Sequence, residues 1–281
     1  MSAAPYPPSW YAASAEALPP QPVLAGHIDA DVCILGAGYV GLSTALELAD
    51  AGYRVVVLEA ERIGWGASGR NGGQVLPGYG CGETKLAALV GRDDARKLFD
   101  WSCEGMRLIH QRRTRYGIDC DWRAGHAVVA IKPRQIVELQ SWQRELEQDY
   151  GYPMTWWNRE ELCARLDSPR YLGGLHDANA GHLHPLKYAL GLGRAALAAG
   201  VRIFEASPVL RIARGANPVL HTAQGTVRCA FAVLAGNALV KGVAPELDRK
   251  IMPVGTYIAA TVPLGAERAQ SLIRNDMAIA D

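Results

Sequence analysis

The segment ILGAGYVG, residues 34–41, contains three glycines in the spacing G-x-G-x-x-G: Gly36, Gly38 and Gly41. This spacing either binds the pyrophosphate of a dinucleotide or forms an ordinary turn between a strand and a helix. In a binding turn, Gly36 permits the tight turn, Gly38 lets the backbone approach the pyrophosphate, and Gly41 lets helix and strand pack closely. Free N–H groups and the positive end of the helix dipole would attract the phosphates.

The surrounding residues favour a dinucleotide. An apolar run at 31–35 predicts a buried strand before the glycines, and apolar residues at helical spacing predict a helix after them that ends at Gly52. A second apolar run at 54–58 ends at Glu59, so the unit spans about 30 residues. A carboxylate at Glu59 would accept hydrogen bonds from ribose hydroxyls and disfavour the additional phosphate of NADP.

Later segments predict an α/β fold. Apolar strands at 201–205 and 231–236 resemble the first two, which indicates a parallel sheet built from distant segments. Between the first two strands and these later two lie helical patterns at 84–90, 93–116, 134–149, 159–166 and 184–200 and strand patterns at 126–132 and 171–177. These predict an inserted antiparallel region. The expected domains are an N-terminal arm at 1–29 with a short helix around 11–18, a nucleotide-binding domain at 30–85 and 185–240, and a substrate-binding domain at 86–184 and 241–281.

Composition excludes several classes of protein. The chain has 281 residues, is 49% hydrophobic and carries a formal charge of +1, so no net field favours nucleic acid. Its six cysteines form no C-x-x-C pair, which predicts free thiols and a reducing, cytoplasmic compartment. No secretory signal or apolar run long enough to span a membrane is expected. A metal site is not expected either, because His182 and His184 have no further Cys/His cluster at ligand spacing.

A glycine-dense loop with bulky residues follows Glu59, in LEAERIGWGASGRNGGQVLPGYG. With this loop the sequence resembles the glycine/D-amino-acid oxidase-like FAD-dependent oxidoreductases, and within them the gamma-glutamylputrescine oxidase branch. Three segments carry the resemblance, residues 31–74, 180–209 and 231–240. It implies a Rossmann-like FAD-binding domain with a parallel sheet, and an inserted antiparallel-sheet substrate domain.

The resemblance implies FAD as the cofactor and places its contacts. The loop would pass the ribityl-pyrophosphate and the edge of the flavin ring. Val209 resembles a position whose backbone meets adenine, although simple strand core explains it equally well. The cofactor-binding residues expected in all are Gly36, Ala37, Gly38, Gly41, Glu59, Ala60, Arg62, Ala67, Ser68, Gly69, Arg70, Asn71, Gly72, Gly73, Gln74, Val209, Ala235 and Gly236.

The resemblance also implies oxidation of a C–N bond in a small amine or amino acid, within polyamine catabolism, with oxygen as acceptor and hydrogen peroxide as product. Candidate catalytic residues are His184, as a proton acceptor, and Tyr257, on an expected substrate-facing strand. Each has a structural alternative: a helix cap for His184 and sheet packing for Tyr257. Arg70 could stabilise the reduced flavin or bond local carbonyls. Trp156 and Trp157 are expected to be core and surface of one strand rather than an aromatic cage for a cationic substrate.

Two other functions remain open on the sequence. A nicotinamide-dependent dehydrogenase shares the glycine spacing but does not explain the long glycine-dense loop. Proteins of the resembled family continue beyond the position of Asp281, whereas this sequence stops inside the apolar run IRNDMAIAD. The resemblance therefore leaves a non-catalytic, truncated remnant as the second alternative.

Overall fold

The structure is a computed structural model that describes residues 4–240 and 242–281. The chain divides into two compact units. The first comprises Met1–Asn71, Arg115–Cys120 and His184–Ala259, and the second comprises Gly72–Thr114, Asp121–Leu183 and Ala260–Asp281. Compared with the domains expected from the sequence, the first unit also takes in the N-terminal arm, residues 115–120 and residues 241–259. The change of unit after Asn71 falls inside the glycine-dense loop.

A four-stranded parallel sheet forms the centre of the first unit, in the order β12-β2-β3-β8. Its strands are the four apolar runs predicted from the sequence: β2 (Val32–Leu35), β3 (Val55–Leu58), β8 (Arg202–Phe204) and β12 (Phe231–Leu234). All of β3 is buried, as expected for a strand covered on both faces. The prediction of a parallel sheet from distant segments is confirmed.

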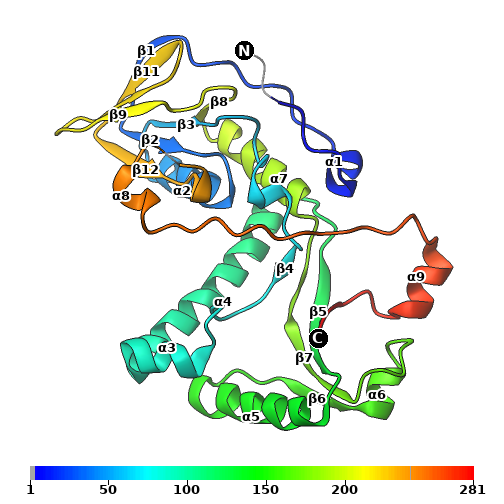
Figure 1. The fold of residues 1–281 in the computed structure, drawn as a ribbon. Helices are drawn as coiled ribbons and strands as arrows, with labels where there is room; N and C mark the ends of the chain where they lie inside the picture. The colour runs from blue at the N-terminus through cyan, green and yellow to red at the C-terminus, as the bar shows by residue number, and fades with distance from the viewer. Residues whose placement is uncertain (1–3, 241) are drawn as a thin grey trace. The chain divides into compact units, whose positions relative to one another are not determined.

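Two helices connect and cover these strands. α2 (Tyr39–Asp50) joins β2 to β3 and buries Leu42, Ala45 and Leu46, and it contacts both strands. α7 (Pro185–Ala198) leads into β8, begins with a proline at its first turn as predicted, and packs against α2. In Figure 1, both helices lie beside this sheet. The N-terminus of α2 follows the end of β2, so the three glycines lie where strand and helix meet.

The first unit has a second sheet that the sequence analysis did not predict. Its order is β1-β11-β10-β9, from the strands β1 (Gly26–Asp29), β11 (Gly225–Arg228), β10 (Val219–His221) and β9 (Arg211–Ala213). β1 pairs in parallel with β11, so the last residues of the expected arm belong to a sheet. The helix expected around 11–18 is shorter, α1 (Trp10–Ser14), and the backbone is already extended at the next residue, Ala15.

The second unit contains a mixed sheet in the order β13-β5-β7-β4, with β6 also paired to β7. The strands are β4 (Gln74–Val75), β5 (Arg123–Ala130), β6 (Thr155–Asn158), β7 (Gly173–His182) and β13 (Ala278–Ala280). β4, β5 and β6 are antiparallel to β7, as expected, whereas β13 is parallel to β5. The apolar run that ends the sequence therefore forms an edge strand.

Four helices of the second unit lie where the sequence predicts them: α3 (Glu83–Val90), α4 (Arg92–Arg115), α5 (Pro133–Tyr150) and α6 (Arg159–Cys163), although α6 ends earlier than expected. A fifth, α9 (Ala266–Leu272), was not predicted. The capping box of Asn158 and Glu161 forms at the start of α6. On β6, Trp157 is buried and Trp156 is half-buried, so the two belong to one strand as expected, with Trp157 rather than Trp156 in the core. α5 packs against β5 and β7, and Figure 1 shows it beside β7.

Three short helical segments complete the first unit: η1 (Ala67–Gly69), η2 (Asn237–Leu239) and α8 (Pro245–Asp248). All six cysteines are free thiols, which confirms that prediction, and Cys33 is fully buried in β2. Within residues 4–240 and 242–281, none of the helices combines the length and apolar character that crossing a bilayer requires.

Candidate functional site

The predicted glycine turn joins β2 to α2, and sterics require two of its glycines. Gly36 has φ +105°, a region that side chains disfavour, and a Cβ there would lie 2.8 Å from the carbonyl oxygen of Ala235. A Cβ on Gly41 would overlap the carbonyl oxygen of Gly36. Gly41 therefore allows the first turn of α2 to pack directly on the strand-to-helix turn.

The second glycine segment, Ala235–Gly236, lies against this turn. The N–H of Ala235 donates to the carbonyl of Leu35 at 2.8 Å, which extends the pairing of β12 with β2. A Cβ on Gly236 would lie 2.6 Å from a methyl carbon of Val240. The structure thus brings together two segments that are about 200 residues apart in the sequence and that were both predicted to contact the cofactor.

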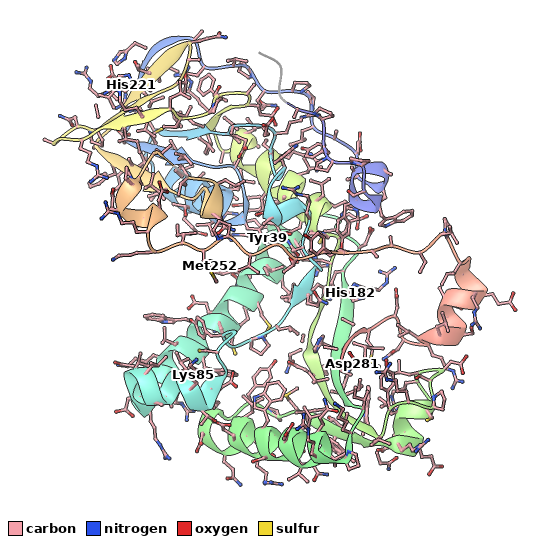
Figure 2. All side chains as sticks on the ribbon, in the orientation of Figure 1. Tyr39, Lys85, His182, His221, Met252 and Asp281 are labelled. Atoms are coloured by element: carbon pink, nitrogen blue, oxygen red, sulfur yellow. The ribbon has the colours of Figure 1, made fainter. Side chains whose placement is uncertain are left out.

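Gly38 and Ser68 meet at the N-terminus of α2. Gly38 is the residue before the helix and has no side chain to cap it. The hydroxyl of Ser68, from the loop after β3, accepts a hydrogen bond from the N–H of Tyr39 at 3.0 Å. Tyr39 is the first residue of α2 and is labelled in Figure 2. A Cβ on Gly38 would lie 2.7 Å from the hydroxyl oxygen of Ser68, so any side chain at Gly38 would fill the space beside the helix end.

Glu59 lies at the end of β3 and faces the glycine turn. Its Oε2 accepts a hydrogen bond from the N–H of Ala37 at 2.7 Å, and its Oε1 accepts one from the N–H of Glu61 at 3.0 Å. Burial raises the pKa of Glu59, and the two backbone donors oppose that shift. A carboxylate offers about four acceptor sites, so two remain for ligand hydroxyls.

The loop after Glu59 uses most of its polar groups locally. The guanidinium of Arg70 lies 4.6 Å from the ring centre of Trp65 and donates to the carbonyl of Gly66, which is the structural alternative considered for this residue. The amide nitrogen of Asn71 donates to the carbonyls of Ala67 and Ser68. These bonds fix the short helix η1, and with it the position of the Ser68 hydroxyl. Two further predicted residues of this loop differ in exposure, since Ala60 is exposed and Gly69 is buried.

Arg62 points toward the N-terminal arm. It donates to the carbonyl of Leu18 at 2.9 Å, and its guanidinium lies 5.0 Å from the ring centre of Tyr6. Its Nε is buried, has no hydrogen-bond partner among the described residues, and lies 3.8 Å from Oε2 of Glu205. A contact between Arg62 and a cofactor stays a prediction.

The predicted residues at the end of the loop, Gly72, Gly73 and Gln74, belong to the second unit. The carbonyl of Gly73 accepts a hydrogen bond from the N–H of Leu183, and Gln74 pairs with His182 in the β4–β7 ladder. Their contact with a cofactor also stays a prediction. Val209 lies in the first unit, where it is 9% exposed and packs in a core cluster with Leu58 and Phe204.

His184 caps a helix. Its Nδ1 accepts a hydrogen bond from the N–H of Lys187 at 3.1 Å in the first turn of α7. Its Nε2 lies 3.0 Å from the hydroxyl of Ser14, and this hydroxyl donates to the carbonyl of Trp10. Because Nδ1 accepts, the neutral ring carries its proton on Nε2 and donates it to Ser14. Both ring nitrogens therefore have structural partners, which is the alternative role considered for His184.

His182 and His184 do not lie on one strand, although they are only two residues apart in the sequence. β7 ends at His182, whose Nε2 contacts the carbonyl oxygen of Asp276, and His184 begins the next stretch of the first unit. Pro185 explains the difference, because it fixes the first turn of α7 and ends the strand before His184.

The strand expected around Tyr257 is wrong. Residues 251–261 form no helix or strand, and Tyr257 is 96% exposed. Met252, labelled in Figure 2, is another large apolar residue of this exposed segment. The β-branched and aromatic residues there have strand propensity, but a strand also needs a neighbour to pair with, and none of the described strands pairs with this segment.

One buried acid near the turn, Glu205, was not among the residues expected from the sequence. It is 3% exposed and follows β8 directly, as Glu59 follows β3. The signal was present, since VRIFE repeats the pattern of the apolar run that ends at Glu59. The second unit has an open pocket of about 830 Å³ between α3 and α5, and none of the predicted site residues lines it. No group of three or more potential metal ligands was found among the described residues.

Comparisons with known proteins agree with this geometry. The family DAO, FAD dependent oxidoreductase, matches residues 31–279. The chain is 43% identical over 258 residues to the probable oxidoreductase OrdL of Haemophilus influenzae, covering 90% of this chain and 60% of that protein. It is 40% identical over 274 residues to the gamma-glutamylputrescine oxidoreductase of Escherichia coli, covering 97% of this chain and 64% of that protein. The chain thus spans less than two thirds of the length of these relatives.

Solved structures show the same fold at lower identity. Glycine oxidase from Geobacillus kaustophilus superposes with a TM-score of 0.62 at 23% identity, covering 79% of this chain and 59% of that one. An L-amino acid deaminase from Proteus vulgaris gives a TM-score of 0.68 at 21% identity, covering 87% and 62%. The α/β fold with a parallel sheet and a further, largely antiparallel sheet is therefore shared with this glycine oxidase and this L-amino acid deaminase. The chain belongs to the DAO family of FAD-dependent oxidoreductases.

Proposed function

We propose that the first unit of this chain binds the ADP half of FAD, and that the protein oxidises a C–N bond of a small amine of the gamma-glutamylputrescine type with oxygen as acceptor. The observation that carries the proposal is the placement of Glu59 at the glycine turn, 2.7 Å from the N–H of Ala37. The family match over residues 31–279 supports FAD rather than a nicotinamide dinucleotide.

The residues of the turn fit an ADP group. The space beside the N-terminus of α2 is one that a side chain on Gly38 would fill, and the helix end favours negative charge. The hydroxyl of Ser68 lies at the same helix end and could bond a phosphate oxygen. The two acceptor sites left on Glu59 suit the two ribose hydroxyls. FAD, when bound, would supply the acceptor for the electron pair that leaves the amine.

The amine substrate must lose its proton before oxidation. The sequence suggested His184 as the proton acceptor, and the structure does not favour that role. His184 has a structural partner at each ring nitrogen, so it is not free to take the proton. We propose instead that the amine binds in its neutral form after losing its proton to bulk water, because removal from water lowers the pKa of an ammonium group. The substrate class rests on the 40% identity to the gamma-glutamylputrescine oxidoreductase of Escherichia coli.

Two measurements test this function. Purified chain is titrated with FAD, and binding is followed by quenching of flavin fluorescence. It is then supplied with gamma-glutamylputrescine, putrescine, glycine and D-alanine, and hydrogen peroxide is measured. We expect FAD binding and peroxide from the gamma-glutamylated amine. Absence of FAD binding would overturn the proposed function. FAD binding with peroxide only from an amino acid would overturn the substrate class.

A further inference from the structure

Glu205 joins three segments of the first unit. Its Oε1 accepts a hydrogen bond from the N–H of Ile63 at 2.8 Å, in the loop after β3. Its Oε2 accepts one from the N–H of Gln21 at 3.0 Å, in the N-terminal arm, and lies 3.8 Å from Nε of Arg62. A carboxylate that is 3% exposed needs such partners, because an uncompensated buried charge is costly. Glu205 thereby ties the end of β8 to both the loop and the arm.

Ile63 is held from both sides. Its N–H donates to Glu205, and its carbonyl accepts a hydrogen bond from the hydroxyl of Tyr6 at 2.8 Å. Its side chain is fully buried. The two side chains fix both peptide groups of Ile63, and thus the course of the loop at this point.

Gly64, the residue after Ile63, connects the loop to the glycine turn. The N–H of Gly64 donates to the carbonyl of Ala37 at 2.9 Å. Ala37 is the residue whose own N–H bonds the carboxylate of Glu59. Gly64 lies close to α7, since a Cβ there would be 2.8 Å from Cβ of Ala189. The bonds therefore run from Glu205 through Ile63 and Gly64 to Ala37 and Glu59.

Backbone bonds hold the neighbouring residues independently of the Glu205 side chain. The N–H of Ser207 donates to the carbonyl of Glu59 at 2.8 Å, and the N–H of Ala206 donates to the carbonyl of Glu61 at 3.1 Å. These bonds remain when only the Glu205 side chain is changed. The carboxylate of Glu205 therefore holds Ile63 and the N-terminal arm, which those backbone bonds do not.

We infer that Glu205 is a positioning residue for the cofactor: it fixes Ile63 and Gly64 so that Ala37 and Glu59 keep the geometry that receives the ADP half of FAD. Glu205 itself does not touch the ligand. This inference rests on the proposed function, since it concerns the same turn. It predicts that Glu205 affects affinity for ADP as well as for FAD, because the flavin is not needed for the effect.

The test measures dissociation constants for ADP and FAD by titration, together with the urea midpoint of the ligand-free chain. For Glu205→Ala we expect both dissociation constants to rise about ten-fold, the size of one lost charge-assisted hydrogen bond. Glu205→Gln keeps an acceptor for Ile63, so it should restore most of the affinity. Tyr6→Phe removes the other bond to Ile63, and its effect combined with Glu205→Ala should be smaller than the product of the two, because both act through one residue.

Glu83 provides a matched control. It is a buried carboxylate of the second unit that accepts a hydrogen bond from Nε1 of Trp142 at 2.9 Å. Glu83→Ala should lower the urea midpoint and leave both dissociation constants unchanged. The inference is overturned if Glu205→Ala lowers the midpoint in the same way and binds ADP and FAD like the wild type.

Two further outcomes are informative. If Glu205→Ala does not fold, Tyr6→Phe decides, because it removes a single hydroxyl: unchanged affinity overturns the inference and weaker binding of both ligands supports it. If the wild-type chain binds neither ADP nor FAD, the proposed function fails, and the inference fails with it. The wild-type titration therefore distinguishes the two failures.

Discussion

The hydroxyl oxygen of Ser68 lies 2.7 Å from the point that a Cβ on Gly38 would occupy, whereas Cβ of Ser68 lies 3.7 Å from it. The first distance is too short for two atoms that are not bonded, and the second is ordinary contact. The glycine turn and the loop after β3 are thus fitted to each other at the N-terminus of α2. A substitution at Ser68 can therefore distinguish a collision within the protein from a collision with a bound ligand.

Gly38→Ala should destabilise the ligand-free chain and weaken FAD binding at least ten-fold, because the new methyl group collides with Ser68 and with the space for the pyrophosphate. Adding Ser68→Ala removes the first collision only. We expect the double variant to regain the urea midpoint of Ser68→Ala but not its FAD affinity. Recovery of full FAD affinity in the double variant would show that no phosphate lies beside Gly38.

Glu59→Ala should weaken binding of ADP and FAD by about 1–3 kcal/mol, the usual cost of losing a charged acceptor. The Ala37 N–H loses its partner at the same time, so the ligand-free chain should lose a similar amount of unfolding free energy. Titration calorimetry with ADP measures the first effect. Asp31→Asn is the control, because Asp31 pairs with Arg54 at the start of β2, the other end of the strand from the glycine turn. Equal ADP affinity in Glu59→Ala and Asp31→Asn would remove Glu59 from the site.

The turn could be predicted from the sequence because its causes are local. One β-α-β unit contains Gly36, Gly41 and Glu59, and their roles follow from sterics and from the end of a strand. Glu205 and the strand β1 depend on partners about 140 or more residues away, and no rule of sequence spacing predicts such pairs. Tyr257 shows the reverse case, since strand propensity was present without a strand to pair with.

The second unit should lose unfolding free energy as the pH falls below about 6.5, the usual pKa of histidine. His126 is buried, and burial lowers its pKa; the charge of Asp177, directly across the β5–β7 ladder, opposes the shift, and His176 and His182 add to it. Below its usual pKa the unfolded chain binds more protons than the folded one, so acid favours unfolding until the lowered pKa is also passed.

His126→Gln should make this fall shallower, because one buried proton-binding group is removed. His110 and His176, whose pKa values burial also lowers, would account for the slope that remains. Five of the seven tryptophans lie in the second unit, so tryptophan fluorescence in urea reports mainly on it. Midpoints are compared at several pH values between 7.5 and 5. Parallel curves for wild type and His126→Gln would contradict the assignment to His126.

His184→Ala should lower the free energy of unfolding by about 0.5–2 kcal/mol, the cost of losing an N-cap. His184→Asn should recover most of that loss, because asparagine is among the best N-cap residues and its oxygen can accept the N–H of Lys187. Neither change removes a group that is free to take a proton from a substrate, since Ser14 and Lys187 use the two ring nitrogens. We therefore expect His184→Asn to bind FAD normally and, where the wild type forms peroxide from an amine, to do so at a similar rate. An asparagine variant with wild-type urea midpoint and FAD affinity but no peroxide formation would instead make His184 a catalytic residue.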